Sequence, residues 1–181
     1  MKKLIITLVV AFLGWSAGAQ VTSVSLQASG LTCSMCSNAI NKSLKTLSSV
    51  STVEPNIKTS TFVIAFKEGS KVDFDELKKK VEDAGFFVAK LEATMNFENV
   101  AVANDGHVVV NGNTFHFLDV KDQTLNGDKT LRLLDKGFVP AKEYKRNAKL
   151  TMMECYKTGV AGNCCAKEGL AAGSRIFHVS I

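Results

Sequence analysis

Two of the five cysteines stand three positions apart, in the segment Cys33-Ser34-Met35-Cys36. This spacing can aim both sulfur atoms at a single point. Small and apolar residues then recur at three- and four-residue intervals, which predicts a helix with Cys36 in its first turn. The positive end of the helix dipole and the free backbone N–H groups there favour thiolate over thiol. Because thiolates are soft ligands, the pair is expected to select thiophilic metal ions over Mg²⁺ or Ca²⁺.

The number of ligands narrows the choice of ion. A closed tetrahedral zinc site needs four protein ligands, and no histidine stands near Cys33 and Cys36 in the sequence. Two thiolates therefore suit low-coordinate Cu(I) best. Zn(II), Hg(II) and Cd(II) also accept two thiolates, so the sequence leaves the identity of the ion open.

Two other interpretations of the same pair compete with metal binding. The cysteines could form a structural disulfide, or the redox-active disulfide of a thiol-disulfide oxidoreductase, because thioredoxin-like proteins also place Cys-x-x-Cys at a helix start. The motif lacks the Trp-Cys-Gly-Pro-Cys character, however, and neither Pro55 nor Pro140 stands where a proline-bearing loop beside the site is expected. We therefore favour metal binding.

The residues around the pair predict the framework that positions it. Asp73 with Glu76 three residues later indicates a helix start, and Gly85 suits a helix end. The predicted elements are a strand over 21–26, a helix over 36–47, strands over 50–56 and 61–66, a helix over 73–84 and a strand over 87–91. This β-α-β-β-α-β order is the split βαβ arrangement of a ferredoxin-like fold.

With this order in place, residues 21–94 resemble the heavy-metal-associated domain family. The family comprises copper chaperones, mercury-binding periplasmic proteins and N-terminal domains of metal-transport ATPases. The resemblance rests on Gly30-x-Thr32-Cys33-x-x-Cys36 and on Gly85-Phe86 after the second helix. It implies that Cys33 and Cys36 are the metal ligands and that Phe86 shields the ion. Leu31 departs from the methionine usual in the family, at a position whose role there is packing.

The pattern of the first nineteen residues predicts a secretory signal. Lys2 and Lys3 form a charged start, an apolar run over 4–15 follows, and Ala17-Gly18-Ala19 is a small-x-small cleavage site. The apolar run is shorter than the roughly 20 residues that a membrane-spanning helix needs. We expect the signal (1–19) to be removed and the remaining chain to be periplasmic or secreted, without membrane insertion.

The remaining chain is expected to form two domains, a heavy-metal-associated domain over 20–95 and a β-rich domain over 96–181. The second part carries short strand candidates separated by the turn signals Asn104-Asp105-Gly106, Asn111-Gly112 and Asn126-Gly127. Pro140 can start a short helix. Together these features predict an α+β protein whose C-terminal part is a small barrel or sandwich, with an OB-like barrel as one form.

The other three cysteines fall together, as Cys155 and the neighbours Cys164-Cys165. The first interpretation is a disulfide from Cys155 to Cys164 or Cys165, which would tie a glycine-bearing loop and leave one thiol unpaired. The second is another soft-metal site built from Cys155, Cys164 and Cys165. Three histidines, His107, His116 and His178, lie in strand candidates, where solvated or hydrogen-bonded side chains are more common than ligands.

The composition excludes several functions. The formal net charge is +5, and the lysine-rich runs are expected to be solvated helix faces, because export removes most nucleic acid. No Ser/His/Asp arrangement, phosphate loop or paired-carboxylate motif is apparent. We therefore expect a binding function, not catalysis. The expected partner is a metal-donor or metal-acceptor protein with exposed cysteines. A third alternative is a ligand- or partner-binding protein in which the N-terminal module only senses metal.

Overall fold

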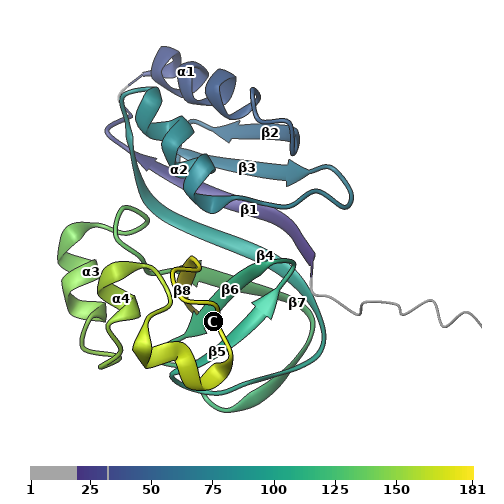
Figure 1. The fold of residues 1–181 in the computed structure, drawn as a ribbon. Helices are drawn as coiled ribbons and strands as arrows, with labels where there is room; N and C mark the ends of the chain where they lie inside the picture. Colours follow the sequence, from purple (N-terminus) through teal and green to yellow (C-terminus); the bar gives the residue numbers. More distant parts are fainter. Residues whose placement is uncertain (1–19, 32) are drawn as a thin grey trace, which may run out of the picture.

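A computed structural model describes residues 20–31 and 33–181 (Figure 1). The predicted signal segment and Thr32 therefore lie outside the described residues. Within the described part of the chain, no helix is both long and apolar enough to span a membrane.

The N-terminal half has the predicted ferredoxin-like order. Its four strands form an antiparallel sheet in the order β2-β3-β1-β4, and α1 and α2 cover one face of it (Figure 1). The elements are β1 (Gln20–Ser29), α1 (Ser34–Leu44), β2 (Val50–Asn56), β3 (Thr61–Phe66), α2 (Phe74–Asp83) and β4 (Phe87–Val102).

The predicted start of α2 is confirmed in detail. The Asp73 carboxylate accepts a hydrogen bond from the backbone N–H of Glu76 at 3.0 Å, which satisfies one of the free donors at the helix start. Phe74, Leu77 and Val81 are buried on one side of the helix. That buried stripe fixes α2 against the sheet.

The C-terminal half continues the same sheet. Strands β5 (Gly106–Val110), β6 (Asn113–Phe117), β7 (Gln123–Leu133) and β8 (Ile176–Ser180) extend it in the order β4-β7-β8-β6-β5, which makes one eight-stranded sheet. The separate barrel or sandwich is therefore not confirmed. The reason is the length of β4, which does not end near Leu91 but pairs with β1 and then with β7 as far as Val102.

A second difference concerns the turn expected at Asn126-Gly127. These residues lie inside β7, opposite a bulge in β4 where the register shifts between Phe97 and Val100. The Asn126 side chain accepts a hydrogen bond from the backbone N–H of Asn99 at 2.8 Å. The asparagine and glycine thus accommodate a bulge in paired strands instead of a chain reversal.

One buried core runs through both halves. Phe74 of α2 packs edge-on against Phe115 of β6 and Phe177 of β8, with ring centroids 6.1 and 5.1 Å apart. Residues 95 and 96, on either side of the expected domain boundary, both lie within β4. The N-terminal helices therefore contribute directly to the packing of the C-terminal strands.

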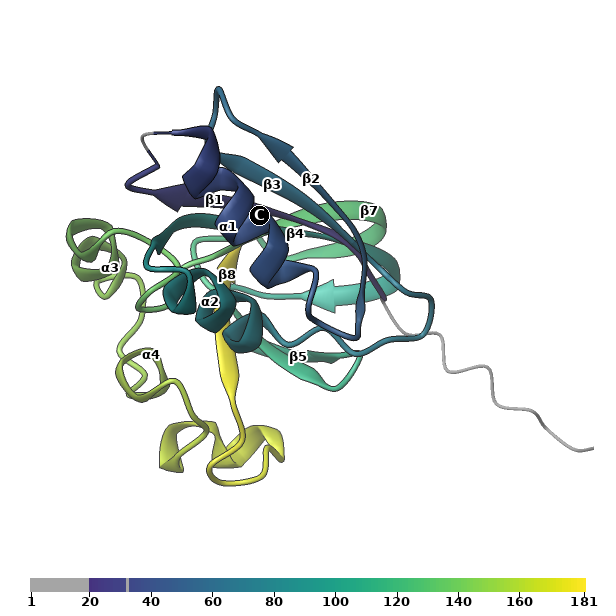
Figure 2. The same ribbon diagram turned by 90° about the horizontal axis from the view of Figure 1, so that it is seen from above.

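The segment between β7 and β8 carries the remaining helices. These are α3 (Ala141–Asn147), which follows Pro140 as expected, α4 (Cys155–Thr158) and the 3₁₀ helix η1 (Asn163–Glu168). Viewed from above, α1 and α2 lie over the sheet, whereas this segment lines one side of the molecule (Figure 2). Residues 153–170 pack on the face of β8 that carries Ile176, so they form a lid over that face.

Candidate metal sites

The predicted cysteine pair lies where β1 passes into α1. Cys33 is the N-cap of α1, and its sulfur accepts a hydrogen bond from the backbone N–H of Cys36 at 3.4 Å. The two Sγ atoms are 2.8 Å apart. Cys33 is exposed and Cys36 is half-buried. The loop therefore presents both sulfurs at one point that another molecule can reach.

The electrostatics of this helix start favour thiolates. The hydrogen bond from the Cys36 thiol, and then that from the Cys36 backbone N–H, lower the pKa of the Cys33 thiol below its ordinary value. No acidic residue stands in the first turn of α1, so nothing there opposes the helix dipole. The lowered pKa makes it easier to form the thiolate that a soft metal ion binds.

The residues that flank the pair form an apolar rim. Phe86 is partly buried, packs on the core, and its ring comes within 3.9 Å of the position that a Cβ on Gly30 would occupy. Gly30 has φ +82°, a conformation that other residues rarely adopt. Met35 and Phe87 are 81% and 69% exposed. Phe86 thus lies against the cysteine loop, as expected, and the exposed apolar side chains suit contact with a partner protein.

The second group of cysteines is also brought together. Cys155 begins α4, Cys164 and Cys165 lie in η1, and their three sulfur atoms lie within 4.8 Å of one another. All five cysteines of the chain are free. The structure shows no disulfide at Cys155, and the three sulfurs lie close enough together for the second interpretation, a soft-metal site, which stays a prediction.

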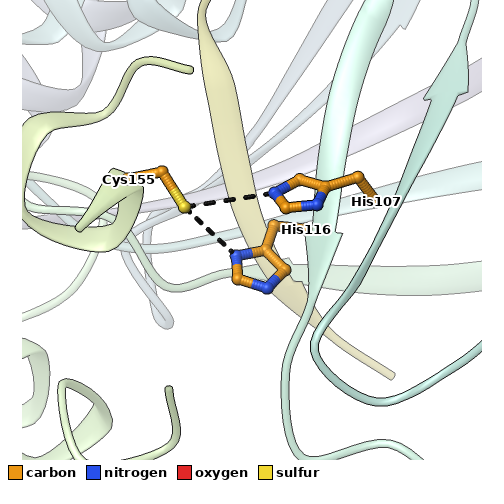
Figure 3. Close-up of side chains that lie close together, drawn as sticks. All are labelled: His107, His116 and Cys155. Carbon is orange, nitrogen blue, oxygen red and sulfur yellow. Dashed lines mark hydrogen bonds between the residues drawn. The ribbon is translucent and has the colours of Figure 1, made fainter. Parts of the chain in front are cut away.

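Two histidines join this cluster, which sequence reasoning did not expect. The Cys155 sulfur lies 4.0 Å from Nε2 of His107 and 3.7 Å from Nδ1 of His116 (Figure 3). The Cys165 sulfur lies 3.8 Å from the same Nε2 of His107. Both imidazoles are shielded from solvent, with side chains 1% and 0% exposed. Of the two states expected for strand histidines, solvated or hydrogen-bonded, these two side chains show the second, with Glu168 and Asp105 as their partners.

Burial sets the titration of this cluster. It raises the pKa of the Cys155 thiol well above its ordinary range. Burial, and then the charges of His107 and His178, lower the pKa of His116 to about 4. Both shifts favour the neutral forms. Burial therefore favours a neutral Cys155 thiol beside a neutral His116 imidazole, unlike the setting of the exposed pair.

An exposed cysteine pair at the first helix of a βαββαβ unit defines the class as a metal-binding module of ferredoxin-like fold. Comparison with known proteins gives the family. Residues 25–87 match the heavy-metal-associated domain, and the chain belongs to this family.

Three relatives illustrate the range of the family. The mercuric transport protein periplasmic component of Serratia marcescens is 33% identical over 86 residues, which is 48% of this chain and 93% of that protein. The copper chaperone CopZ of Staphylococcus epidermidis is 29% identical over 38% of this chain and 98% of the chaperone. The match to a probable copper-exporting P-type ATPase of Archaeoglobus fulgidus, 32% identical, spans 41% of this chain but 9% of the ATPase.

Solved structures match the same half of the chain. Oxidized MerP from Ralstonia metallidurans CH34 is 30% identical, covers 39% of this chain and 94% of its own, and superposes with a TM-score of 0.35. The matched domain, residues 25–87, ends before β5, so the second cluster lies outside it.

Proposed function

We propose that this protein is an exported carrier that binds a soft metal ion between Cys33 and Cys36 and passes it to another protein. Cu(I) is the favoured ion, with Zn(II), Hg(II) and Cd(II) as alternatives. The observation that carries the proposal is the placement of two converging, accessible sulfurs at the N-terminus of α1. The names of the relatives, copper chaperone and mercuric transport protein, support soft-metal transfer.

The geometry suits transfer by ligand exchange. A two-coordinate ion can accept a third sulfur from a partner before it leaves either of its first two ligands. Cys33, as the more exposed thiol with the lowered pKa, would remain available to such a partner. Met35 and Phe87 would be covered when the partner docks, which would remove exposed apolar surface from water. The protein then binds and delivers without catalysing a reaction.

Export to the periplasm or beyond completes the proposal. It rests on the signal pattern at residues 1–19 and on the periplasmic relative from Serratia. An oxidising compartment would convert the pair to a disulfide, which cannot hold the ion. The carrier therefore requires a reducing partner, or a partner that loads it with metal before oxidation.

A competition titration tests the function. Reduced protein is titrated with Cu(I) in the presence of a chelator of known affinity, and the wild type is compared with the Cys33→Ser/Cys36→Ser variant. Loss of one tightly bound equivalent in the variant is expected. Unchanged stoichiometry would refute the assignment of the pair. Reduction of insulin at thioredoxin-like rates would instead support the oxidoreductase alternative.

A further inference from the structure

Strands β5, β6 and β8 align three histidines in one row. His107 of β5 pairs with His116 of β6, and His116 pairs with His178 of β8. Side chains at paired positions lie on the same face of a sheet, and the first two rings stack with centroids 4.2 Å apart. Phe115 and Phe177 alternate with these histidines and point into the main core. The three histidines thus lie on the other face of the sheet, which is the face that the lid covers.

The lid brings two fully buried sulfurs to this row. Cys155 and Cys165 are both 0% exposed, and each lies within 4.0 Å of an imidazole nitrogen. Thiols are weak hydrogen-bond donors, so these long contacts stabilise the arrangement little. The Cys155 sulfur therefore lies beside both imidazoles and the Cys165 sulfur beside that of His107, among buried side chains.

A carboxylate holds the far nitrogen of each imidazole. Glu168 lies 2.8 Å from Nδ1 of His107 and also accepts from the His107 backbone N–H at 3.1 Å. Asp105 lies 2.9 Å from Nε2 of His116. A carboxylate accepts a hydrogen bond from the N–H of one ring nitrogen. The other ring nitrogen then carries the free lone pair. In both histidines that free lone pair faces the sulfurs, which is the arrangement of metal-bound histidines in proteins.

From these contacts we propose that His107, His116, Cys155 and Cys165 form a closed tetrahedral site that holds Zn(II). Zinc bonds of about 2.3 Å to sulfur and about 2.0–2.1 Å to nitrogen place neighbouring sulfur and nitrogen ligands about 3.5 Å apart in a tetrahedron. The three sulfur–nitrogen separations of 3.7, 3.8 and 4.0 Å need to contract by half an ångström or less. Binding releases the two thiol protons to solvent.

Charge balance favours Zn(II) over Cu(I) at this site. Two thiolates and two neutral imidazoles neutralise a divalent ion, whereas a monovalent ion would leave one negative charge buried. An uncompensated buried charge is costly. Tetrahedral sites with two sulfur and two nitrogen ligands are also typical of zinc. The ion would fasten α4 and η1 to β5 and β6.

Two rival roles explain fewer of the contacts. A disulfide between Cys155 and Cys165 would leave both imidazole lone pairs buried without a partner, which costs free energy. The line Cys155–His116–Asp105 also resembles a nucleophile activated by a base, but a fully buried sulfur cannot reach a substrate. A metal ion satisfies both sulfurs and both nitrogens at once.

Metal analysis of full-length protein tests the proposal without interference from the first site. In a Cys33→Ser/Cys36→Ser background, one zinc per chain is expected after purification without chelator. Cys165→Ser and His116→Ala should each lose it. Cys164→Ser is the matched control, because Cys164 adjoins Cys165 but is only partly buried, and this variant should keep the zinc. Loss in Cys164→Ser with retention in His116→Ala would overturn this set of ligands.

Two further measurements keep the proposal falsifiable if a variant misfolds. The Cys33→Ser/Cys36→Ser protein, with the second cluster intact, should show the intense visible absorption of a tetrahedral site and thiolate charge-transfer bands when it is loaded with Co(II). Zinc should raise the melting temperature of the metal-free protein by about 5 °C or more at saturating concentration. Failure of both, or thiol counting that finds Cys155 in a disulfide in the purified protein, would refute the site. Equal binding of Cu(I) with displacement of zinc would refute the choice of ion.

Discussion

The two cysteine groups use the same side chain in opposite settings. Cys33 and Cys36 lie on a loop at the start of α1, open to solvent, with no histidine ligand beside them among the described residues. Cys155 and Cys165 lie on the buried side of the lid, and the imidazoles they contact are hydrogen-bonded to carboxylates. The helix α1 and the segment that carries α4 lie apart in both views (Figures 1 and 2). Exposure and ligand number thus distinguish the proposed transfer site from the proposed structural site.

Thiol reactivity should show the largest difference between the two groups. In metal-free, reduced protein at pH 7, we expect Cys33 to react with iodoacetamide about a thousand times faster than Cys155, or more. Cys33 is exposed and its pKa is lowered, so its thiolate persists to lower pH; Cys155 is buried and its pKa is raised, so it stays protonated. Pulse labelling followed by mass spectrometry at several pH values measures both rates. Similar rates would contradict the contrast in setting.

A core substitution should affect both regions together. Phe74→Ala removes a buried ring that contacts Phe115 and Phe177, and we expect a loss of about 3 kcal/mol in the free energy of unfolding. Urea unfolding followed by circular dichroism measures the loss. Because one core joins the halves, labelling of the Cys33 and Cys155 regions should report the same midpoint. Two separate midpoints would show that the expected domains, 20–95 and 96–181, unfold independently.

The aromatic residue beside the pair should have a smaller effect, confined to the first site. Phe86→Ala opens the loop to water, and we expect about tenfold weaker Cu(I) binding. The neighbouring substitution Phe87→Ala serves as the control, since Phe87 is 69% exposed and should leave the affinity unchanged. Chelator competition gives both constants. Equal losses of Cu(I) affinity in the two variants would contradict a shielding role for Phe86.

The smallest expected effect is at Leu31. Leu31→Met restores the residue usual in the family at a position packed against the core. Because the exchange conserves volume, the change in stability should stay below about 1 kcal/mol, and Cu(I) affinity should change less than about twofold. Thermal unfolding and the same titration measure the two quantities. A large gain in affinity would show that this residue takes part in metal binding.

Local signals predicted the first half of the fold and its site. The helix start at Asp73, the βαββαβ order and the placement of Cys33 before α1 all depend on neighbours in sequence, and all are present. The cluster of Cys155, Cys164 and Cys165 was also visible as a grouping. In these places, the residues that interact are close enough along the chain for periodicity and spacing to report them.

The histidine contribution to the second cluster could not be predicted in the same way. It depends on α4 and η1 folding back against β5 and β6, from which β7 and α3 separate them in the sequence. Such long-range packing leaves no local pattern in the sequence. One signal was available: His107 and His116 flank the Asn111-Gly112 turn at positions that a tight hairpin places opposite each other.

The bulge in β4 determines which insertions and deletions this strand can tolerate. Before it, the buried residues of β4 are odd-numbered, from Leu91 to Phe97; after it, the buried residue is Val102. The extra residue therefore changes which side of the strand faces inward, at the point where the N-terminal half meets the C-terminal half. Deleting Asn99 would move every later side chain of β4 to the opposite face of the sheet. Insertions and deletions in this strand should thus be tolerated in pairs, and single ones selected against.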